Sequence, residues 1–264
     1  MERPENYPSF TDDIYLSLPM RKPGLKPDSW LAGILECDAF ILSDIPSERN
    51  FDSDTAEQIA ELTHSNPGFI YASVSTPRVK TVRLLEDIGF RLVDTRVVFE
   101  REMNTDNKLS GFTEIRFAAA QDEEGVKALA GRSISVSRFH LDPFIPDDIA
   151  NIIKSEWAGN YFKGQRGDAM IVSSTQGRIA GFLQLIRSGE AIVIDLIAVA
   201  PDHRRKRIAR DMIAFAQNQW AVELNLIRAG TQIANFPSIR LYQSLLFNLV
   251  RSDYMLHFHN KKVN

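Results

Sequence analysis

A run of basic residues follows the most apolar segment of the chain. Residues 191–200 are apolar apart from Asp195, and an amphipathic pattern typical of a helix covers residues 207–220. Backbone N–H groups at a helix N-terminus have no intrahelical partner, so they bind phosphates, and basic side chains add to that attraction. The pattern therefore predicts an anion site, with a solvated basic surface as the alternative. Its residues are Arg204, Arg205, Lys206, Arg207, Ile208 and Ala209.

Asn235 and Tyr242 form a second group that is suited to acyl transfer. They are seven residues apart in a helical pattern, which places them about two turns, or roughly 10 Å, apart along the helix axis. Asparagine caps helix N-termini, and a tyrosine hydroxyl can protonate a leaving thiolate as a general acid. The alternative is a core tyrosine that packs with Ile239, Leu245 and Leu246.

Asp195 interrupts an otherwise apolar strand pattern. Burial raises the pKa of a carboxyl group into the range of a useful base. A structural aspartate, hydrogen-bonded to a neighbouring strand, is the alternative. For metals we expect no site, because the spacing of the histidines and carboxylates fits none and a single cysteine, Cys37, excludes a cysteine-based zinc site. His257 and His259 lie on one side of a terminal strand pattern and could bind a metal adventitiously.

Turn-forming residues divide the chain into two parts. We expect a first domain over residues 1–102, a linker over 103–111 and a second domain over 112–264. Six prolines in the first 50 residues predict mainly extended and irregular structure there. Residues 82–93 align without gaps on residues 239–250, with five of twelve positions identical. A degenerate tandem duplication explains this repeat, and chance similarity of two helix–strand units is the alternative.

The second part predicts a mixed α/β sheet with helices on both faces. Alternating and continuous apolar runs predict strands over residues 113–117, 168–174, 178–186, 191–199, 224–229 and 249–258. Helical patterns cover residues 121–131, a segment starting at Pro146, and residues 207–220 and 235–246.

The order of these elements and both motifs resemble the GNAT superfamily of N-acetyltransferases. Residues 204–209 resemble its Arg/Gln-x-x-Gly-x-Gly/Ala motif, except that Arg207 replaces the central glycine, and Leu246 replaces another frequent glycine. The resemblance implies a GNAT fold after a truncated GNAT-like first domain, and acetyl-CoA as co-substrate. It implies pyrophosphate binding by residues 204–209, pantetheine alongside Ile197 and Val199, a coenzyme contact from Asn235, and Tyr242 as general acid.

The whole chain further resembles the TDP-fucosamine acetyltransferases. The matching residues are 83–94, Ser137-Arg138-Phe139, Pro146-Asp147-Asp148, Trp157, Thr231-Gln232, Asn235 and Leu241-Tyr242. This resemblance implies acetylation of a nucleotide-activated 4-amino-dideoxy sugar for surface glycans, with Asp195 as the base. It places the acceptor against Arg138, His140 and Asp142, for which surface loop residues are the alternative. Two rival functions stay open: a non-catalytic acyl-CoA-binding or regulatory module, and a GNAT enzyme acting on a different amine.

Composition limits the classes of partner. Charged residues make up 25% of the 264 residues, with 34 Asp and Glu against 31 Lys and Arg, so the net charge of −3 predicts no general attraction to nucleic acid or anionic membranes. We find no signal-peptide pattern at the start of this sequence and no apolar run of about 20 residues. We therefore expect a cytoplasmic protein whose acceptor is a small-molecule amine. A homodimer is one option for its oligomeric state.

Overall fold

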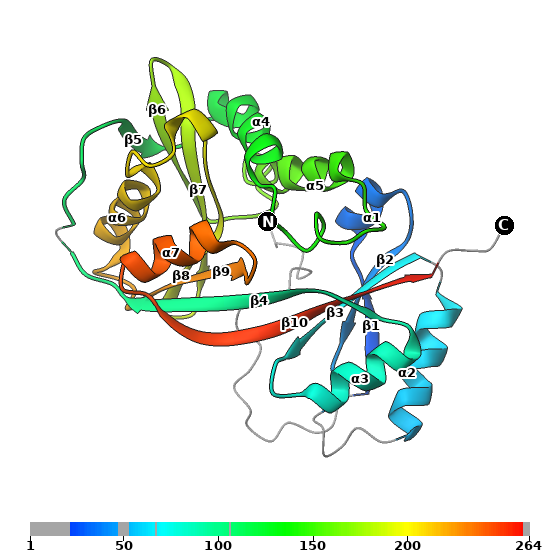
Figure 1. Ribbon diagram of the computed structural model, residues 1–264. Helices are drawn as coiled ribbons and strands as arrows, with labels where there is room; N and C mark the ends of the chain where they lie inside the picture. Colours follow the sequence, from blue (N-terminus) through cyan, green and yellow to red (C-terminus); the bar gives the residue numbers. More distant parts are fainter. Residues whose placement is uncertain (1–21, 47–52, 67, 106, 261–264) are drawn as a thin grey trace.

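One mixed β-sheet runs through both parts of the molecule. The computed structural model describes residues 22–46, 53–66, 68–105 and 107–260 (Figure 1). The strands within these residues are β1 (Gly24–Pro27), β2 (Ala39–Ser43), β3 (Gly68–Ser75), β4 (Arg91–Glu102), β5 (Glu114–Phe117), β6 (Ala169–Thr175), β7 (Arg178–Ser188), β8 (Ala191–Val199), β9 (Leu226–Gln232) and β10 (Asn248–Asn260). The helices are α1 (Ser29–Leu35), α2 (Ser53–Ser65), α3 (Val79–Ile88), α4 (Glu123–Ser133), α5 (Asp147–Gly159), α6 (Ile208–Trp220) and α7 (Phe236–Ser244), with single 3₁₀ turns at Ala120–Asp122 and Pro201–His203.

Two long strands join the halves of this sheet. The strand order is β1-β2-β3-β10-β4-β9-β8-β7-β6-β5. The last strand of the first half, β4, pairs with β9 of the second half, and the last strand of the second half, β10, pairs with β3 of the first. β4 and β10 also pair with each other in antiparallel fashion and cross the molecule side by side (Figure 1). Each half therefore completes the sheet of the other.

The β4–β10 pair has a pseudo-twofold axis at its centre. Arg96 lies opposite Asp253, 157 positions later, and the same offset exchanges the neighbouring pairs Thr95–Tyr254 and Val97–Ser252. The offset also relates the starts of α3 and α7 and of β4 and β10. Corresponding residues contact each other reciprocally at a twofold axis. The repeat found in the sequence thus occupies equivalent places in the two halves.

Helices cover both faces of the sheet, as the sequence predicted. In the second half α6 packs on one face and α4 with α5 on the other. In the first half α2 and α3 cover a core built around Ile70 and Phe90. On the opposite face α1 packs against α5, with Leu31, Phe69 and Ile153 buried between them. Each buried side chain of this kind contributes about 1.5–3 kcal/mol, so the halves share a core as well as a sheet.

The predicted elements of the second part agree with the structure to within a few residues, and β8 has the predicted bounds. In the first part, residues 24–43 form β1, α1 and β2, so irregular structure does not dominate there. Pro4, Pro8 and Pro19 lie outside the described residues. The division into two domains stays a prediction. No helix in the described part of the chain has the length and apolarity needed to span a membrane.

We predict that Asp253→Asn destabilises the whole chain. Asp253 is fully buried and accepts hydrogen bonds from Arg96 Nη2 and Arg251 Nε, both at 2.9 Å. Removing the charge leaves two arginines facing each other. Breaking a buried ion pair costs about 3–5 kcal/mol, and the partial exposure of both arginines favours the lower figure. Urea unfolding measures the loss.

Glu100→Gln is the matched control on β4. Glu100 pairs with Arg228 of β9, and both side chains are about a quarter exposed. The loss of such a pair costs about 0–1 kcal/mol. Equal losses for Asp253→Asn and Glu100→Gln would contradict the central role of the Arg96–Asp253 pair.

Candidate functional site

A gap opens between the parallel strands β8 and β9. They pair only over residues 191–194 and 226–229, after which β8 continues beside β7 alone. Asp195 is the extra residue of a β-bulge in β8, at the point where the pairing with β9 ends. Bulges increase the local twist of a strand and are frequent near active sites. The backbone of Ile197 and Val199 on the β9 side is thus available to an extended ligand that adds like a strand.

The loop before α6 has the backbone conformation of a glycine-rich loop. Arg205 and Arg207 both have φ of +63°, in the left-handed region that favours glycine, and Arg207 stands where the motif has its central glycine. Leu246, the second departure from the motif, has φ of +61°. This conformation costs roughly 1–2 kcal/mol for a residue with a side chain. The two substitutions therefore leave the glycine-type backbone in place.

The predicted anion-binding residues lie together at the end of the gap. Arg204 donates to the carbonyl oxygens of Val199 and Ser133, each at 3.3 Å, and so fastens the loop to β8 and to the end of α4. Arg205, Lys206 and Arg207 are exposed. Ile208 is buried and Ala209 half-buried, so we expect both to contribute through the unpaired N–H groups of the first turn of α6.

Tyr242 lies on α7, within the buried cluster that also contains the last paired residues of the gap, Ile194 and Ala229. Its ring packs against Phe99 and Phe247. Among the described residues none hydrogen-bonds the Tyr242 hydroxyl. Burial raises the pKa of this hydroxyl, so it stays protonated at neutral pH.

Asn235 begins α7, and its predicted cap is confirmed. Its Oδ1 accepts a hydrogen bond from the Ser238 N–H at 3.4 Å, and its Nδ2 donates to Thr231 Oγ1 at 3.1 Å. The cap fixes the start of the helix that carries Tyr242. The turn between β9 and α7 is thereby held beside the open end of the gap.

Asp195 is fully engaged in hydrogen bonds. Arg166 donates to both of its oxygens, at 2.7 and 2.5 Å, and the side chains of Trp157 and Gln184 donate to Oδ2 at 2.9 and 3.0 Å. These four hydrogen bonds leave little of the carboxylate for a ligand to contact. The predicted role as base stays a prediction. The geometry favours a positioning role in which Asp195 holds Arg166 and Trp157 beside the gap.

Lys154 of α5 is a buried ammonium group that the sequence analysis missed. Its Nζ lies 4.5 Å from the ring centroid of Trp157 and 5.5 Å from that of Phe139. Among the described residues no carboxylate forms an ion pair with it. Burial lowers the pKa of Lys154 to about 7, with a further contribution from Arg138, while Asp195 opposes the shift.

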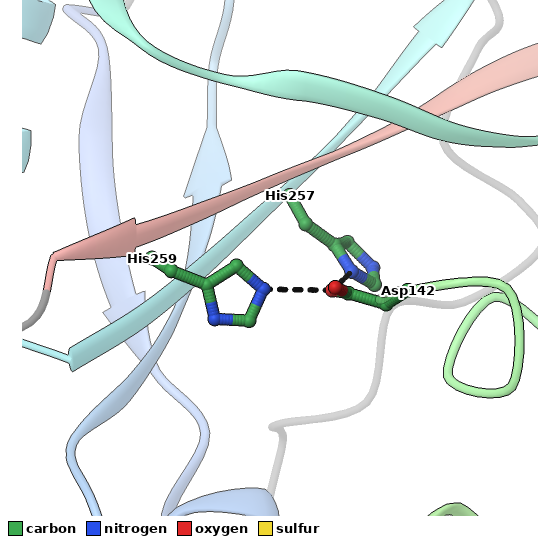
Figure 2. A group of neighbouring side chains, drawn as sticks. All are labelled: Asp142, His257 and His259. Atoms are coloured by element: carbon green, nitrogen blue, oxygen red, sulfur yellow. Dashed lines mark hydrogen bonds and ion pairs between the residues drawn. The ribbon is translucent and has the colours of Figure 1, made fainter. Parts of the chain in front are cut away.

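The loop between α4 and α5 brings two of the three predicted acceptor residues together. Arg138 stacks on Tyr71 of β3, with its Cζ 3.9 Å from the ring centroid, and its Nη1 lies 3.2 Å from His257 Nε2. Asp142 Oδ2 lies 2.6 Å from His257 Nδ1 and 2.7 Å from His259 Nε2 (Figure 2).

His140 points elsewhere, toward Ser137 Oγ and Asn151 Oδ1, at 2.7 and 3.1 Å. It lies in the same loop as Arg138 and Asp142 but makes no contact with the network of His257. Its bonds tie the loop to α5. We therefore expect His140 to shape the loop, whereas Arg138 and Asp142 connect it to the sheet.

Asp142, His257 and His259 have donor atoms within 4.8 Å of one another, close enough for a metal ion. A guanidinium group only donates, so Arg138 identifies His257 Nε2 as the acceptor and Nδ1 as the protonated nitrogen. A metal on Nδ1 would require a proton on Nε2, facing the guanidinium. The donor set therefore fits a hydrogen-bonded network better than a metal site.

The charges of this network agree with that interpretation. Burial lowers the pKa of His257 to about 4, although Asp142 opposes the shift, so the imidazole is neutral near pH 7. Burial disfavours the ionised form of Asp142, but the bonds from His257, His259 and the Phe144 N–H together hold the pKa of that carboxyl below its usual range. The two histidines of β10 thus anchor the loop through one carboxylate (Figure 2).

Comparison with known proteins identifies the fold of the chain. Residues 136–247 match the model of the acetyltransferase (GNAT) family, whose members use acetyl-CoA as co-substrate. Over 152 residues the chain is 34% identical to the spore coat polysaccharide biosynthesis protein SpsD of Bacillus subtilis (strain 168), a match that covers 57% of this chain and 52% of SpsD. The chain thus matches about half the length of that relative.

Solved structures show the same fold. A GCN5-related N-acetyltransferase from Kribbella flavida has a TM-score of 0.55 at 14% identity, covering 84% of this chain and 81% of that one. A tandem GNAT protein from the clavulanic acid biosynthesis pathway has a TM-score of 0.54 at 10% identity, covering 86% and 76%. The chain has the GNAT fold.

We predict that Lys154→Met changes the pH dependence of stability. The pKa of Lys154 is about 7 in the folded protein and near 10.5 when unfolded, so between these values the unfolded state binds more protons. The wild type should therefore gain stability as pH rises from about 7 to 10. Lys154→Met should lack this gain and be more stable near pH 6, by on the order of a few kcal/mol.

Urea unfolding at several pH values measures this effect. Lys127→Met is the control, because Lys127 pairs with Glu156 and is only partly buried. Parallel stability curves for the wild type and Lys154→Met would contradict the burial of an unpaired ammonium group.

Proposed function

We propose that the protein is an N-acetyltransferase that moves an acetyl group from acetyl-CoA to the amine of a small acceptor. The observation that carries the proposal is the gap between β8 and β9, bordered by Tyr242 on one side and the loop of residues 204–209 at its end. This gap lies within the residues that match the family model. An extended pantetheine chain and an anionic pyrophosphate are the groups that such a gap and such a loop would bind.

In this proposal the acetyl carbonyl lies where β8 and β9 part, and a backbone N–H of β8 polarises its oxygen. The amine attacks the thioester directly. Tyr242 then donates its hydroxyl proton to the departing thiolate. Asp195 acts through Arg166 and Trp157, by keeping both side chains beside the gap.

The acceptor that we propose is a nucleotide-activated 4-amino-dideoxy sugar. The likeness to SpsD, a protein named for spore coat polysaccharide biosynthesis, supports a sugar. Arg138 and Lys154 support an anionic substrate, because neither forms an ion pair with a carboxylate in the described residues. An acceptor with phosphate groups would supply that negative charge.

A non-catalytic acyl-CoA-binding module is the second candidate. Arg207 favours it, since a side chain stands where the motif has glycine and limits how closely a phosphate approaches the backbone. The presence of Tyr242 beside the gap favours catalysis. Turnover of any amine separates the two candidates.

We also propose that the first half is a truncated GNAT-like domain. Its strands β2 and β3 are parallel and pair only over residues 39–41 and 69–71, as β8 and β9 do over their first residues. At the position of Tyr242 it has Leu85, which is fully buried. The first half would therefore keep the fold without the proton donor.

We predict that Lys206→Glu weakens coenzyme binding. Reversing one charge beside the unpaired N–H groups of α6 should raise the Kd for acetyl-CoA about tenfold or more at low salt, and the effect should shrink as salt screens it. Isothermal titration calorimetry measures the Kd. Lys26→Glu, an exposed lysine of β1, is the control. Equal affinities of the two variants would refute this position for the pyrophosphate.

We predict that Tyr242→Phe abolishes most turnover while the fold survives. The ring and its packing against Phe99 and Phe247 remain, and the hydroxyl has no hydrogen bond to lose in the described structure. General acid catalysis is worth about 10²–10⁴-fold, so kcat should fall by that factor with acetyl-CoA affinity nearly unchanged. Thiol release from acetyl-CoA measures kcat.

Leu85→Ala is the control for Tyr242→Phe. It should lower stability, because Leu85 is buried in the first half, but it should leave kcat near the wild-type value. Full kcat in Tyr242→Phe would make the tyrosine structural.

A further inference from the structure

Asp94 of β4 is a buried carboxylate, and one of its two oxygens lacks a hydrogen-bond donor in normal geometry among the described residues. It is 6% exposed, and its Oδ1 accepts a hydrogen bond from the Thr95 N–H at 2.7 Å. Its Oδ2 is shielded from solvent and accepts no hydrogen bond of normal geometry from the described residues. Shielding a charged oxygen from water without a hydrogen-bond partner lowers the stability of the folded protein. A role of Asp94 in binding or catalysis would account for this loss of stability.

The pseudo-twofold axis shows how an equivalent position is satisfied. The residue that corresponds to Asp94 in β10 is Arg251, which donates to both oxygens of Asp253. Arg96, two residues after Asp94, also donates to Asp253. Both arginines thus serve one aspartate, and Asp94 has no ion pair among the described residues.

The groups that face Asp94 come from four elements. Arg96 lies on β4, Gln232 ends β9, Arg138 comes from the loop between α4 and α5, and Met255 lies opposite on β10. Burial raises the pKa of Asp94 to about 6, against the hydrogen bonds from the Thr95 N–H and the Gln232 side chain and the charges of Arg138 and Arg96. The carboxyl group is therefore mostly ionised near pH 7 and able to take up a proton.

Asp94 lies on the side of the sheet that the acceptor would approach. Residues directly opposite each other, and residues two apart on one strand, share a face, so Asp94, Arg96 and Gln232 do so. Arg138 is half-buried and lies near enough to act on Asp94 through its charge. Gln232 ends β9, which borders the gap, so Asp94 lies on the strand next to β9 and just beyond its paired end.

We propose that Asp94, supplied by the first half, binds the amino group of the acceptor and takes the proton that its nitrogen loses. This inference rests on the proposed function. As the nitrogen bonds to the acetyl carbon, the C–S bond breaks and the sulfur takes a proton from Tyr242. The Asp94 carboxylate accepts the proton that leaves the nitrogen. Solvent then returns one proton to Tyr242 and receives one from Asp94, so the charges balance.

The test compares the wild type with Asp94→Asn, which keeps the shape and the acceptor for the Thr95 N–H. Acetylation of TDP-4-amino-4,6-dideoxygalactose and of a panel of amino sugars is followed by thiol release across pH 5–9. We expect kcat/KM for the amine to fall at least 100-fold, the acidic limb near pH 6 to disappear, and the Kd for acetyl-CoA to stay unchanged. Asp94→Glu should restore part of the activity and the acidic limb.

Stability supplies a readout that does not depend on turnover. At pH 7.5 Asp94→Asn should raise Tm by a few degrees, because it removes a buried charge without an ion pair. The gain should shrink as pH falls below about 6 and vanish only below about 4, where the carboxyl group is protonated in the unfolded state as well. A lower Tm would mean a structural role and overturn the proposal. Glu100→Gln, on the same strand and face, should change neither activity nor pH profile.

Two outcomes distinguish a wrong role for Asp94 from a wrong proposed function. An active wild type with an equally active Asp94→Asn contradicts the role of Asp94 alone. A wild type that acetylates no amine contradicts the proposed function, and the role of Asp94 with it.

Discussion

The pairing of β4 with β10 around Arg96 and Asp253 is the constraint on which the rest of the molecule depends. It turns two repeated halves into one sheet, because each half contributes its last strand to the other. The same exchange places β4 of the first half next to β9, the strand that borders the gap. Without β4, the last strand of the first half, the second half would have an open sheet edge at β9 and would lack Asp94.

The periodicity of the second half predicted its elements well, because amphipathic helices and buried strands leave strong local signals. The repeat was also visible, through positions such as Phe90 and Phe247. The exchange of strands was not, since pairing between residues 157 positions apart depends on tertiary packing rather than on local pattern. Among the described residues 22–46, the prolines predicted extended and irregular structure, and the structure has the strands β1 and β2 with the helix α1 between them.

The motif residues of the candidate site were found because their spacing is local: the loop of residues 204–209, and Asn235 with Tyr242. The charged network was missed because it assembles from distant segments. One local signal existed, since Lys154 falls on the buried stripe of α5 with Ala150 and Ile153. Asp195 stood out in the sequence, but only the structure reveals the four bonds that occupy it.

We propose that acyl transfer occurs where the two halves meet. A crystal structure with CoA and an N-acetylated amino-sugar nucleotide bound would show the positions of both products. We expect the sulfur in the gap between β8 and β9, within hydrogen-bonding distance of the Tyr242 hydroxyl. The amide nitrogen should lie on the α5 side, within reach of Asp94. A product bound without any contact to β4, or CoA bound outside the gap, would contradict the account.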